Sequence, residues 1–322
     1  MPEAIILDRV TRRYGDTIAV SELSLTVAPG EMFGLIGPDG AGKTTTIRLI
    51  CGLVQADAGL VRVLGFDPVR EHGRVAERVG YLSQRFSLYG DLTIDENIAF
   101  FAEIHGVRDY AARRDRLLGM TQLTPFRSRL ADRLSGGMRQ KLALACTLVH
   151  EPALIVLDEP TTGVDPVSRR EFWKLLSDFL SQGITVVMAT PYLDEAERCS
   201  RVALLHEGRL LALDTPDRLR AALPGALVEV IVRDHRRAAA VLKRIPGVAD
   251  VQMFGERAHV RLEFPVQDAS ERLGSGLAVA GLAAESVRPI AASLEDVFIA
   301  RLGAHPSNRE QAPRGSGLRA RG

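Results

Sequence analysis

The sequence is poor in cysteine and in long apolar runs, and each shortage excludes a class of protein. Its 322 residues include only Cys51, Cys146 and Cys199, far apart and without a C-x-x-C pair. We therefore expect free thiols in a reducing, cytoplasmic compartment and no disulfide framework. No run approaches the roughly 18 apolar residues of a membrane span, and no signal-like stretch opens the chain. With a net charge of +1, no nucleic-acid partner is expected.

A glycine-rich loop is the strongest motif that is present. Residues 37–44 fit the pattern G-x-x-x-x-G-K-[ST], between a strand-like run at 32–36 and a helical pattern at 45–50. Glycines let backbone N–H groups converge on phosphate oxygens, and the positive helix end adds to the attraction. The predicted nucleotide-binding residues are Gly37, Pro38, Asp39, Gly40, Ala41, Gly42, Lys43, Thr44 and Thr45. Among them Lys43 is predicted to reach the β- and γ-phosphates, and the Thr44 hydroxyl to ligate Mg²⁺.

Two carboxylates end a second apolar run. Residues 154–157 are apolar throughout, as in a buried parallel strand, and they lead into Asp158 and Glu159. Ligands of open α/β sheets bind at the carboxyl ends of the strands. Asp158 is therefore predicted to hold Mg²⁺, and Glu159 to orient or deprotonate an attacking water. A solvated strand end is the alternative, and the phosphate loop argues against it.

A third motif opens another helical pattern. Ser135, Gly136 and Gly137 precede a helix predicted from Met138 to Val149. A hydroxyl and bare amides at a helix start form a second candidate anion site. A capped helix without a ligand is the alternative for these three residues alone.

Together, these motifs resemble the ATPase subunit of an ABC transporter, over residues 3 to about 220. The resemblance implies the α/β fold of a P-loop NTPase, with a RecA-like core, an antiparallel β subdomain and a helical subdomain. It also implies ATP and Mg²⁺ as cofactors. Residues 37–44 correspond to the Walker A loop, 154–159 to the Walker B strand and 134–140 to the signature motif.

The resemblance assigns roles to further residues. Tyr14 is similar to the aromatic residue that stacks on adenine, and Asp165 to the aspartate of the D-loop. Gln84 is similar to the Q-loop glutamine, with catalytic and Mg²⁺-binding roles. In this family Ser135 and Gly137 bind the ATP held by the other subunit. A head-to-tail dimer with two enclosed ATP molecules is therefore implied, either a homodimer or a mixed pair.

Two positions depart from the family pattern. Asp39 stands where asparagine is usual, so a negative charge lies close to the expected phosphates. Pro191 follows the predicted strand 184–189 at the place of a histidine that contacts the γ-phosphate. Proline offers neither a side-chain donor nor a backbone N–H. We expect slow hydrolysis, unless another group such as Thr190 supplies the contact.

The chain is predicted to contain an ATPase domain and a smaller accessory domain. The ATPase domain is expected at residues 1–222, with its helical subdomain at about 86–150. Residues 225–302 read as βαββαβ, which predicts an α+β ferredoxin-like domain. A disordered tail is predicted for residues 303–322 because Pro, Ser, Gly and Arg dominate there. His259, inside the accessory domain, is expected at the surface.

The accessory domain also resembles that of drug- and polysaccharide-exporting ABC ATPases. The function predicted from the sequence is thus ATP hydrolysis that powers export through a separate ABC-2-type membrane permease, at the inner face of the cell membrane. Large apolar residues at 85–93 are expected to dock this permease, with packing inside the helical subdomain as the alternative. Two other functions remain open: a soluble ABC ATPase acting on ribosomes or DNA, and a slow or non-hydrolysing ATP-dependent regulator.

Overall fold

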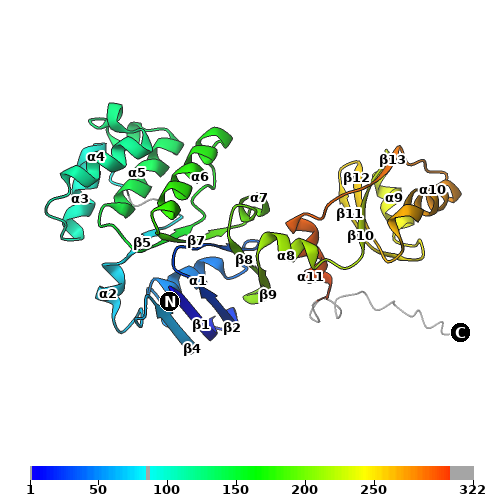
Figure 1. Cartoon of the computed structure of the whole chain (residues 1–322), viewed down its shortest axis with the longest axis horizontal. Coiled ribbons are helices and arrows are strands. Elements are labelled where there is room, and N and C mark those ends of the chain that lie inside the picture. The colour runs from blue at the N-terminus through cyan, green and yellow to red at the C-terminus, as the bar shows by residue number, and fades with distance from the viewer. Residues whose placement is uncertain (1, 85–87, 305–322) are drawn as a thin grey trace, which may run out of the picture. The chain divides into compact units, whose positions relative to one another are not determined.

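The structure is a computed structural model that describes residues 2–84 and 88–304. The predicted docking residues 85–87, and the predicted disordered tail from residue 305 onward, lie outside the described residues. The tail prediction is wrong for residues 303 and 304, because the last helix, α11 (Leu294–Ala304), continues through them. The chain divides into two compact units after Pro216 (Figure 1). The predicted ATPase domain extends further, to residue 222, although the last strand of its sheet ends at Asp214.

A six-stranded sheet forms the centre of the first unit. Its strands lie in the order β5-β6-β7-β3-β8-β9, all parallel except the last pair. The central strands are apolar runs buried on both faces, as expected for parallel strands covered by helices. The strands are β3 (Met32–Ile36), β5 (Val79–Leu82), β6 (Leu154–Asp158), β7 (Thr185–Thr190), β8 (Arg201–His206) and β9 (Arg209–Asp214).

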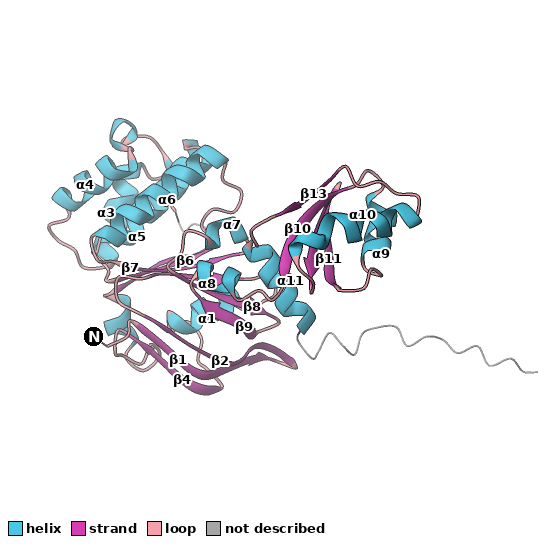
Figure 2. Cartoon of the chain, turned by 45° about the vertical axis from the view of Figure 1, so that its right-hand side comes forward, coloured by secondary structure: helices cyan, strands magenta, loops and turns pink. Residues whose placement is uncertain are grey.

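A second, antiparallel sheet covers one side of this core. It has the order β2-β1-β4, built from β1 (Ile5–Tyr14), β2 (Thr17–Val27) and β4 (Ala58–Val63). Helix α1 (Lys43–Ile50) lies between the two sheets (Figure 2). Buried side chains from both sheets and from α1 form one hydrophobic cluster. This packing fixes the start of α1, directly after the phosphate loop, at the edge where the parallel strands end.

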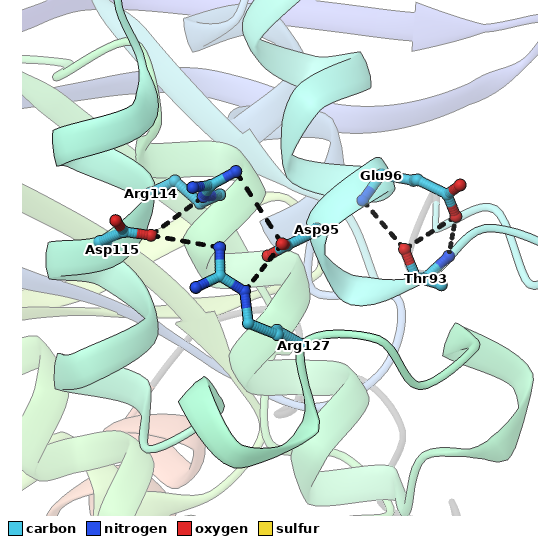
Figure 3. A network of polar contacts seen from close by, with 6 residues as sticks. All are labelled: Thr93, Asp95, Glu96, Arg114, Asp115 and Arg127. Carbon is cyan, nitrogen blue, oxygen red and sulfur yellow. Dashed lines mark hydrogen bonds and ion pairs between the residues drawn. The ribbon is translucent and has the colours of Figure 1, made fainter.

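The helical subdomain is built mainly from α3 (Ile94–Ile104), α4 (Ala111–Thr121) and α5 (Gly136–Leu148). Thr93 and Glu96 form a capping box at the start of α3, in which each side chain bonds the other's backbone N–H (Figure 3). The Arg127 guanidinium lies 2.8 Å from Asp95 and 3.4 Å from Asp115, so it links α3 to α4. The segment that leads into α5 is thereby attached to both preceding helices.

The other helices of the first unit are short, apart from α6. They are α2 (His72–Ala76), η1 (Thr124–Phe126), η2 (Ala131–Arg133), α6 (Pro166–Ser181) and α7 (Leu193–Ala196), and α8 (Pro216–Ala221) crosses the division between the units. The three cysteines are all buried and unpaired. Within the described ranges, no helix is long and apolar enough to cross a membrane.

The second unit is an antiparallel sheet with the strand order β11-β12-β10-β13. The chain order βαββαβ and this strand order are those of a ferredoxin-like fold. Its elements are β10 (Ala226–Ile231), α9 (His235–Leu242), β11 (Val248–Phe254), β12 (Arg257–Leu262), η3 (Val266–Asp268), α10 (Ala269–Val279) and β13 (Ser286–Pro289). A separate hydrophobic cluster joins α9 and α10 to one face of the sheet. His259, expected at the surface, is partly buried: its side chain is 19% exposed and contacts Asp296 of α11 at 2.9 Å.

Candidate nucleotide site

The phosphate loop lies between β3 and α1, as the sequence predicts. Gly42 caps α1 with φ at +95°, which side chains disfavour, and an added Cβ would lie 2.4 Å from the Ala19 carbonyl oxygen. No side chain caps the amides that open α1. Glycine at this position therefore keeps the helix start bare, and free amides at a helix start attract anions.

Lys43 is nearly buried at the start of α1. Its amino group donates to the carbonyl oxygens of Gly37 at 2.9 Å and Pro38 at 3.1 Å. It also forms an ion pair with Glu159, 3.1 Å away, and the two side chains are 4% and 9% exposed. Carbonyl groups of the loop thus bind the Lys43 amino group, which also faces the Glu159 carboxylate directly after β6.

The side chains of Thr44, in α1, and Asp158, the last residue of β6, lie side by side. The Thr44 hydroxyl donates to an Asp158 carboxylate oxygen at 3.0 Å. Burial raises the pKa of the Asp158 carboxyl above its ordinary value, although the hydrogen bond from Thr44 opposes this rise. A hydroxyl and a carboxylate side by side are oxygen donors of the kind that Mg²⁺ prefers.

Glu159 stands at the centre of the polar contacts. Besides the ion pair with Lys43, its carboxylate accepts a hydrogen bond from the Gln84 amide at 3.2 Å and one from the Thr162 hydroxyl at 3.5 Å. These contacts face a pocket of about 600 Å³. The pocket is lined by Thr17, Ile18, Ala19, Asp39, Gly40, Ala41, Gly42, Lys43, Thr44, Thr45, Gln84, Glu159 and Glu207.

Four of these lining residues were not predicted from the sequence: Thr17, Ile18, Ala19 and Glu207. The first three belong to β2, and Glu207 lies in the turn between β8 and β9. The backbone N–H of Gly208 donates to the Ala41 carbonyl oxygen at 3.2 Å, which holds this turn against the phosphate loop. No motif marks these residues, because only the pairing of distant segments brings them to the pocket.

Tyr14 lies beside the pocket but is not part of its lining. It pairs with Thr17 where β1 meets β2, and its side chain is 42% exposed. The Arg12 guanidinium stands 4.8 Å from the centre of its ring. One ring face of Tyr14 is therefore covered by a cation.

Ser135, Gly136 and Gly137 lie outside the first pocket, at the start of α5. The Ser135 hydroxyl accepts a hydrogen bond from the Met138 backbone N–H at 3.3 Å, so it caps the helix. A Cβ added to Gly137 would lie 2.3 Å from the Ser168 hydroxyl oxygen, which explains glycine there. Gly136 borders a separate pocket of about 330 Å³, shared with the loop at Thr162, Gly163 and Val164.

Asp165 serves as the cap of α6. Its carboxylate accepts hydrogen bonds from the backbone N–H groups of Val167 at 3.1 Å and Ser168 at 3.0 Å. The hydrogen bonds from Ser168 and Val167 lower the pKa of this carboxyl. The Asp165 side chain is therefore engaged in capping α6, and it lines neither of the two pockets.

The hydroxyl of Thr190, the residue suggested as a replacement for the missing histidine, is bonded inside the protein. Thr190 is fully buried at the end of β7, and its hydroxyl donates to the Glu195 carboxylate at 2.7 Å. It also accepts a hydrogen bond from the Tyr192 backbone N–H at 3.1 Å. The hydroxyl is thus engaged inside the protein and does not line the nucleotide pocket.

A mostly parallel α/β sheet with a phosphate loop, a buried lysine and paired carboxylates at its strand ends defines a P-loop nucleotide-binding protein. Comparison with known proteins gives the family. The ABC transporter family model matches residues 20–162.

Full-length relatives extend this match. The daunorubicin resistance ATP-binding protein DrrA3 of Streptomyces coeruleorubidus is 37% identical over 302 residues, covering 92% of this chain and 95% of that protein. The probable multidrug ABC transporter ATP-binding protein YbhF of Escherichia coli is 39% identical over 311 residues; the match covers 94% of this chain, but the chain spans only 53% of YbhF. The chain belongs to the ATP-binding proteins of ABC transporters.

Solved structures agree with this family. The ATP-binding subunit of an ABC transporter matches with a TM-score of 0.62 and 29% identity, covering 68% of this chain and 92% of that one. A bacterial ABC transporter cassette solved as a dimer matches with a TM-score of 0.58 and 26% identity, covering 66% of this chain and 98% of that one.

Proposed function

We propose that this chain is the ATP-binding and hydrolysing subunit of an ABC exporter that works through a separate membrane subunit. The observation that carries the proposal is that Lys43, Thr44 and Glu159 line one pocket, with Asp158 bonded to the Thr44 hydroxyl directly behind it. The names of the relatives support export, because one is a multidrug transporter protein and another a daunorubicin resistance protein. A third group of relatives, about 40% identical over 240 residues, is named for Nod factor export.

In this proposal the phosphate loop binds the triphosphate of ATP. The amides from Gly40 to Thr45 and the amino group of Lys43 would take the phosphate oxygens. Thr44, Asp158 and Gln84 would hold Mg²⁺, and their oxygen donors fit this ion. When bound, Mg²⁺ would neutralise part of the phosphate charge.

Glu159 would act as the general base toward an attacking water. In the structure its carboxylate is restrained by Lys43, Gln84 and Thr162. Arriving phosphates would attract Lys43 away from Glu159, and the freed carboxylate oxygen could then accept a proton from water. Gln84 and Thr162 would keep the carboxylate oriented during this exchange.

A second subunit would complete the site. Ser135, Gly136 and Gly137 lie outside the pocket that contains Lys43, as expected if they serve the ATP of another subunit. Asp165 would act by fixing the start of α6 beside them. Tyr14, 42% exposed beside the pocket, would stack on adenine with the ring face that Arg12 leaves uncovered.

Hydrolysis is proposed to be slow. Pro191 offers no donor to the γ-phosphate, and the Thr190 hydroxyl is engaged by Glu195. The same observation favours a second candidate function, an ATP-dependent regulator that binds but scarcely hydrolyses ATP. Because Glu159 is present and well placed, we favour a slow ATPase.

The membrane partner is proposed to be an ABC-2-type permease that docks beside the helical subdomain, at the cytoplasmic face of the membrane. An apolar pocket of about 200 Å³ lies there, lined in part by Tyr81, Phe101 and His105. Leu53, another lining residue, is 53% exposed, and Ile104 is 61% exposed. We also propose that residues 1–222 are the motor and residues 225–302 an accessory domain.

Steady-state ATP hydrolysis by the purified chain tests the proposal. We expect a low rate that requires Mg²⁺, falls sharply to a small residual value in Glu159→Gln and rises when the membrane partner is added. ATP binding with no hydrolysis under either condition would instead support the regulator. Absence of ATP binding would refute both functions.

A further inference from the structure

Glu159 has a strained backbone. Its φ is +49°, in the left-handed region that residues with side chains rarely adopt. Such a conformation persists only where the surrounding structure holds it, and it is commonly found at functional sites. The backbone N–H of Glu159 donates to the Ala189 carbonyl oxygen at 2.9 Å, which attaches it to the end of β7.

Two side chains hold the residues that follow. The Gln140 amide, in the helix that Ser135 caps, donates to the Pro160 carbonyl oxygen. The Thr161 hydroxyl donates to one oxygen of the Glu195 carboxylate at 2.5 Å. The loop after β6 is therefore held from α5 on one side and from α7 on the other.

Glu195 links this loop to the neighbouring strand. Its second carboxylate oxygen accepts the hydrogen bond from Thr190, the last residue of β7. Glu195 is 1% exposed, and Thr161 and Thr190 are fully buried. Burying a carboxylate is costly unless its oxygens are satisfied, and here each oxygen accepts a hydroxyl. An apolar residue would avoid this cost, so the carboxylate is expected to serve a specific purpose.

We infer that Glu195, through Thr161 and Thr190, is a positioning residue that holds Glu159 toward the nucleotide. None of the three lines the nucleotide pocket, so they act through the loop and not on the ligand. The link joins the Glu159 loop to the end of β7, immediately before Pro191. This inference rests on the proposed hydrolysis and adds the residues that set its geometry.

The Thr161→Val and Thr161→Ser variants test the inference. Valine keeps the shape but removes the hydroxyl, and serine restores the donor. Because a buried charged acceptor would lose its hydroxyl donor and keep only the longer contact with Arg169 at 3.7 Å, we expect kcat to fall about tenfold to a hundredfold in Thr161→Val. The dissociation constant for Mg-ATP should stay within about twofold, and Thr161→Ser should recover most of kcat.

Thr121→Val is the matched control. The Thr121 hydroxyl is also fully buried, and it donates to the Leu117 carbonyl oxygen at 2.7 Å within α4, outside the described site. We expect this variant to keep the wild-type kcat. If Thr161→Val does not fold, Thr190→Val and Thr190→Ser provide the same comparison at the other end of the link.

Combination with Glu159→Gln separates positioning from general structural damage. Without the carboxylate there is nothing left to position, so Thr161→Val should not lower the residual rate of Glu159→Gln any further. A further loss in this background, a wild-type kcat in Thr161→Val, or no recovery in Thr161→Ser would each overturn the inference.

A structure of the Thr161→Val variant tests the inference even if the wild-type chain hydrolyses no ATP. We expect Glu159 to leave the left-handed region once the link is broken. If Glu159 keeps its positive φ and its contacts with Lys43 and Gln84, the positioning role is refuted. If the wild-type chain does not bind ATP, the proposed function is refuted instead.

Discussion

Replacing Lys43 with alanine is the sharpest test of the nucleotide site. Among the described residues that line the nucleotide pocket, Lys43 is the only cation. Its amino group holds Glu159 at 3.1 Å and the Gly37 carbonyl oxygen at 2.9 Å. The variant removes the group that would neutralise the phosphates and leaves the rest of the loop unchanged.

The expected magnitude follows from the burial of Lys43. Its side chain is 4% exposed, so solvent does little to screen its charge. In the proposed complex Lys43 pairs with phosphate, and truncating one partner of a buried charge pair across a binding interface costs about 2–5 kcal/mol of binding free energy. In the middle of this range, the dissociation constant for Mg-ATP would rise by about a few hundredfold.

Isothermal titration calorimetry with Mg-ATP measures this loss. Lys141→Ala is the matched control, because Lys141 is also nearly buried and pairs with Glu171 at 2.6 Å, outside the pocket. The control should bind ATP with wild-type affinity even if it is less stable. If Lys43→Ala binds as tightly as the wild type, the phosphate-loop assignment is wrong.

Three further predictions concern the dimer, turnover and pH. Glu159→Gln should retain ATP and shift the chain to a dimer in size-exclusion chromatography, and adding Ser135→Arg should prevent that dimer. A double variant that still dimerises with ATP would contradict the shared site. Pro191→His should raise kcat more than it changes KM in steady-state assays, and a folded variant that is no faster would show that the missing imidazole does not limit turnover. Burial, with a smaller contribution from the His105 ring stacked 3.8 Å away, lowers the pKa of His150 to about 4. The unfolded chain takes up this proton near pH 6.5, whereas the folded chain does so only near pH 4. The free energy of unfolding should therefore fall by roughly 2 kcal/mol between pH 6.5 and 4, a value discounted for partial exposure. Denaturation curves of His150→Phe should show a smaller dependence of this free energy on pH.

The fold could be predicted from the sequence wherever apolar runs were long and the boundaries were marked. The strand predicted at 184–189 is β7, Thr185–Thr190, and the helix predicted from Met138 to Val149 is α5, Gly136–Leu148. The order of the strands in the sheets could not be predicted in this way, because it depends on contacts between segments far apart in the chain. The resemblance to a known family, not residue periodicity, supplied the RecA-like core.

The site could be predicted in part. The phosphate loop and the Asp158–Glu159 pair are local motifs, so their residues were identified without a structure. Glu207 and Glu195 were not, because nothing in their neighbourhood distinguishes them from surface carboxylates. Glu195 is fully buried because α7 packs against β3 and β7. Its role depends on tertiary packing, and no local pattern records that.

The charges of the nucleotide pocket explain why one chain alone would hold ATP poorly. Within residues 2–84 and 88–304, its lining contains Lys43 as the only cation and three carboxylates, those of Asp39, Glu159 and Glu207. Lys43 is already paired with Glu159, so an arriving triphosphate meets two further negative groups. Tight binding therefore needs positive potential from elsewhere. A bound divalent cation is one source, and the bare amides that follow Ser135 on a second subunit are another, since helix starts carry partial positive charge. In the proposed function Asp39, where asparagine is usual, would increase this need, so ATP binding would depend more strongly on the metal and on dimer formation.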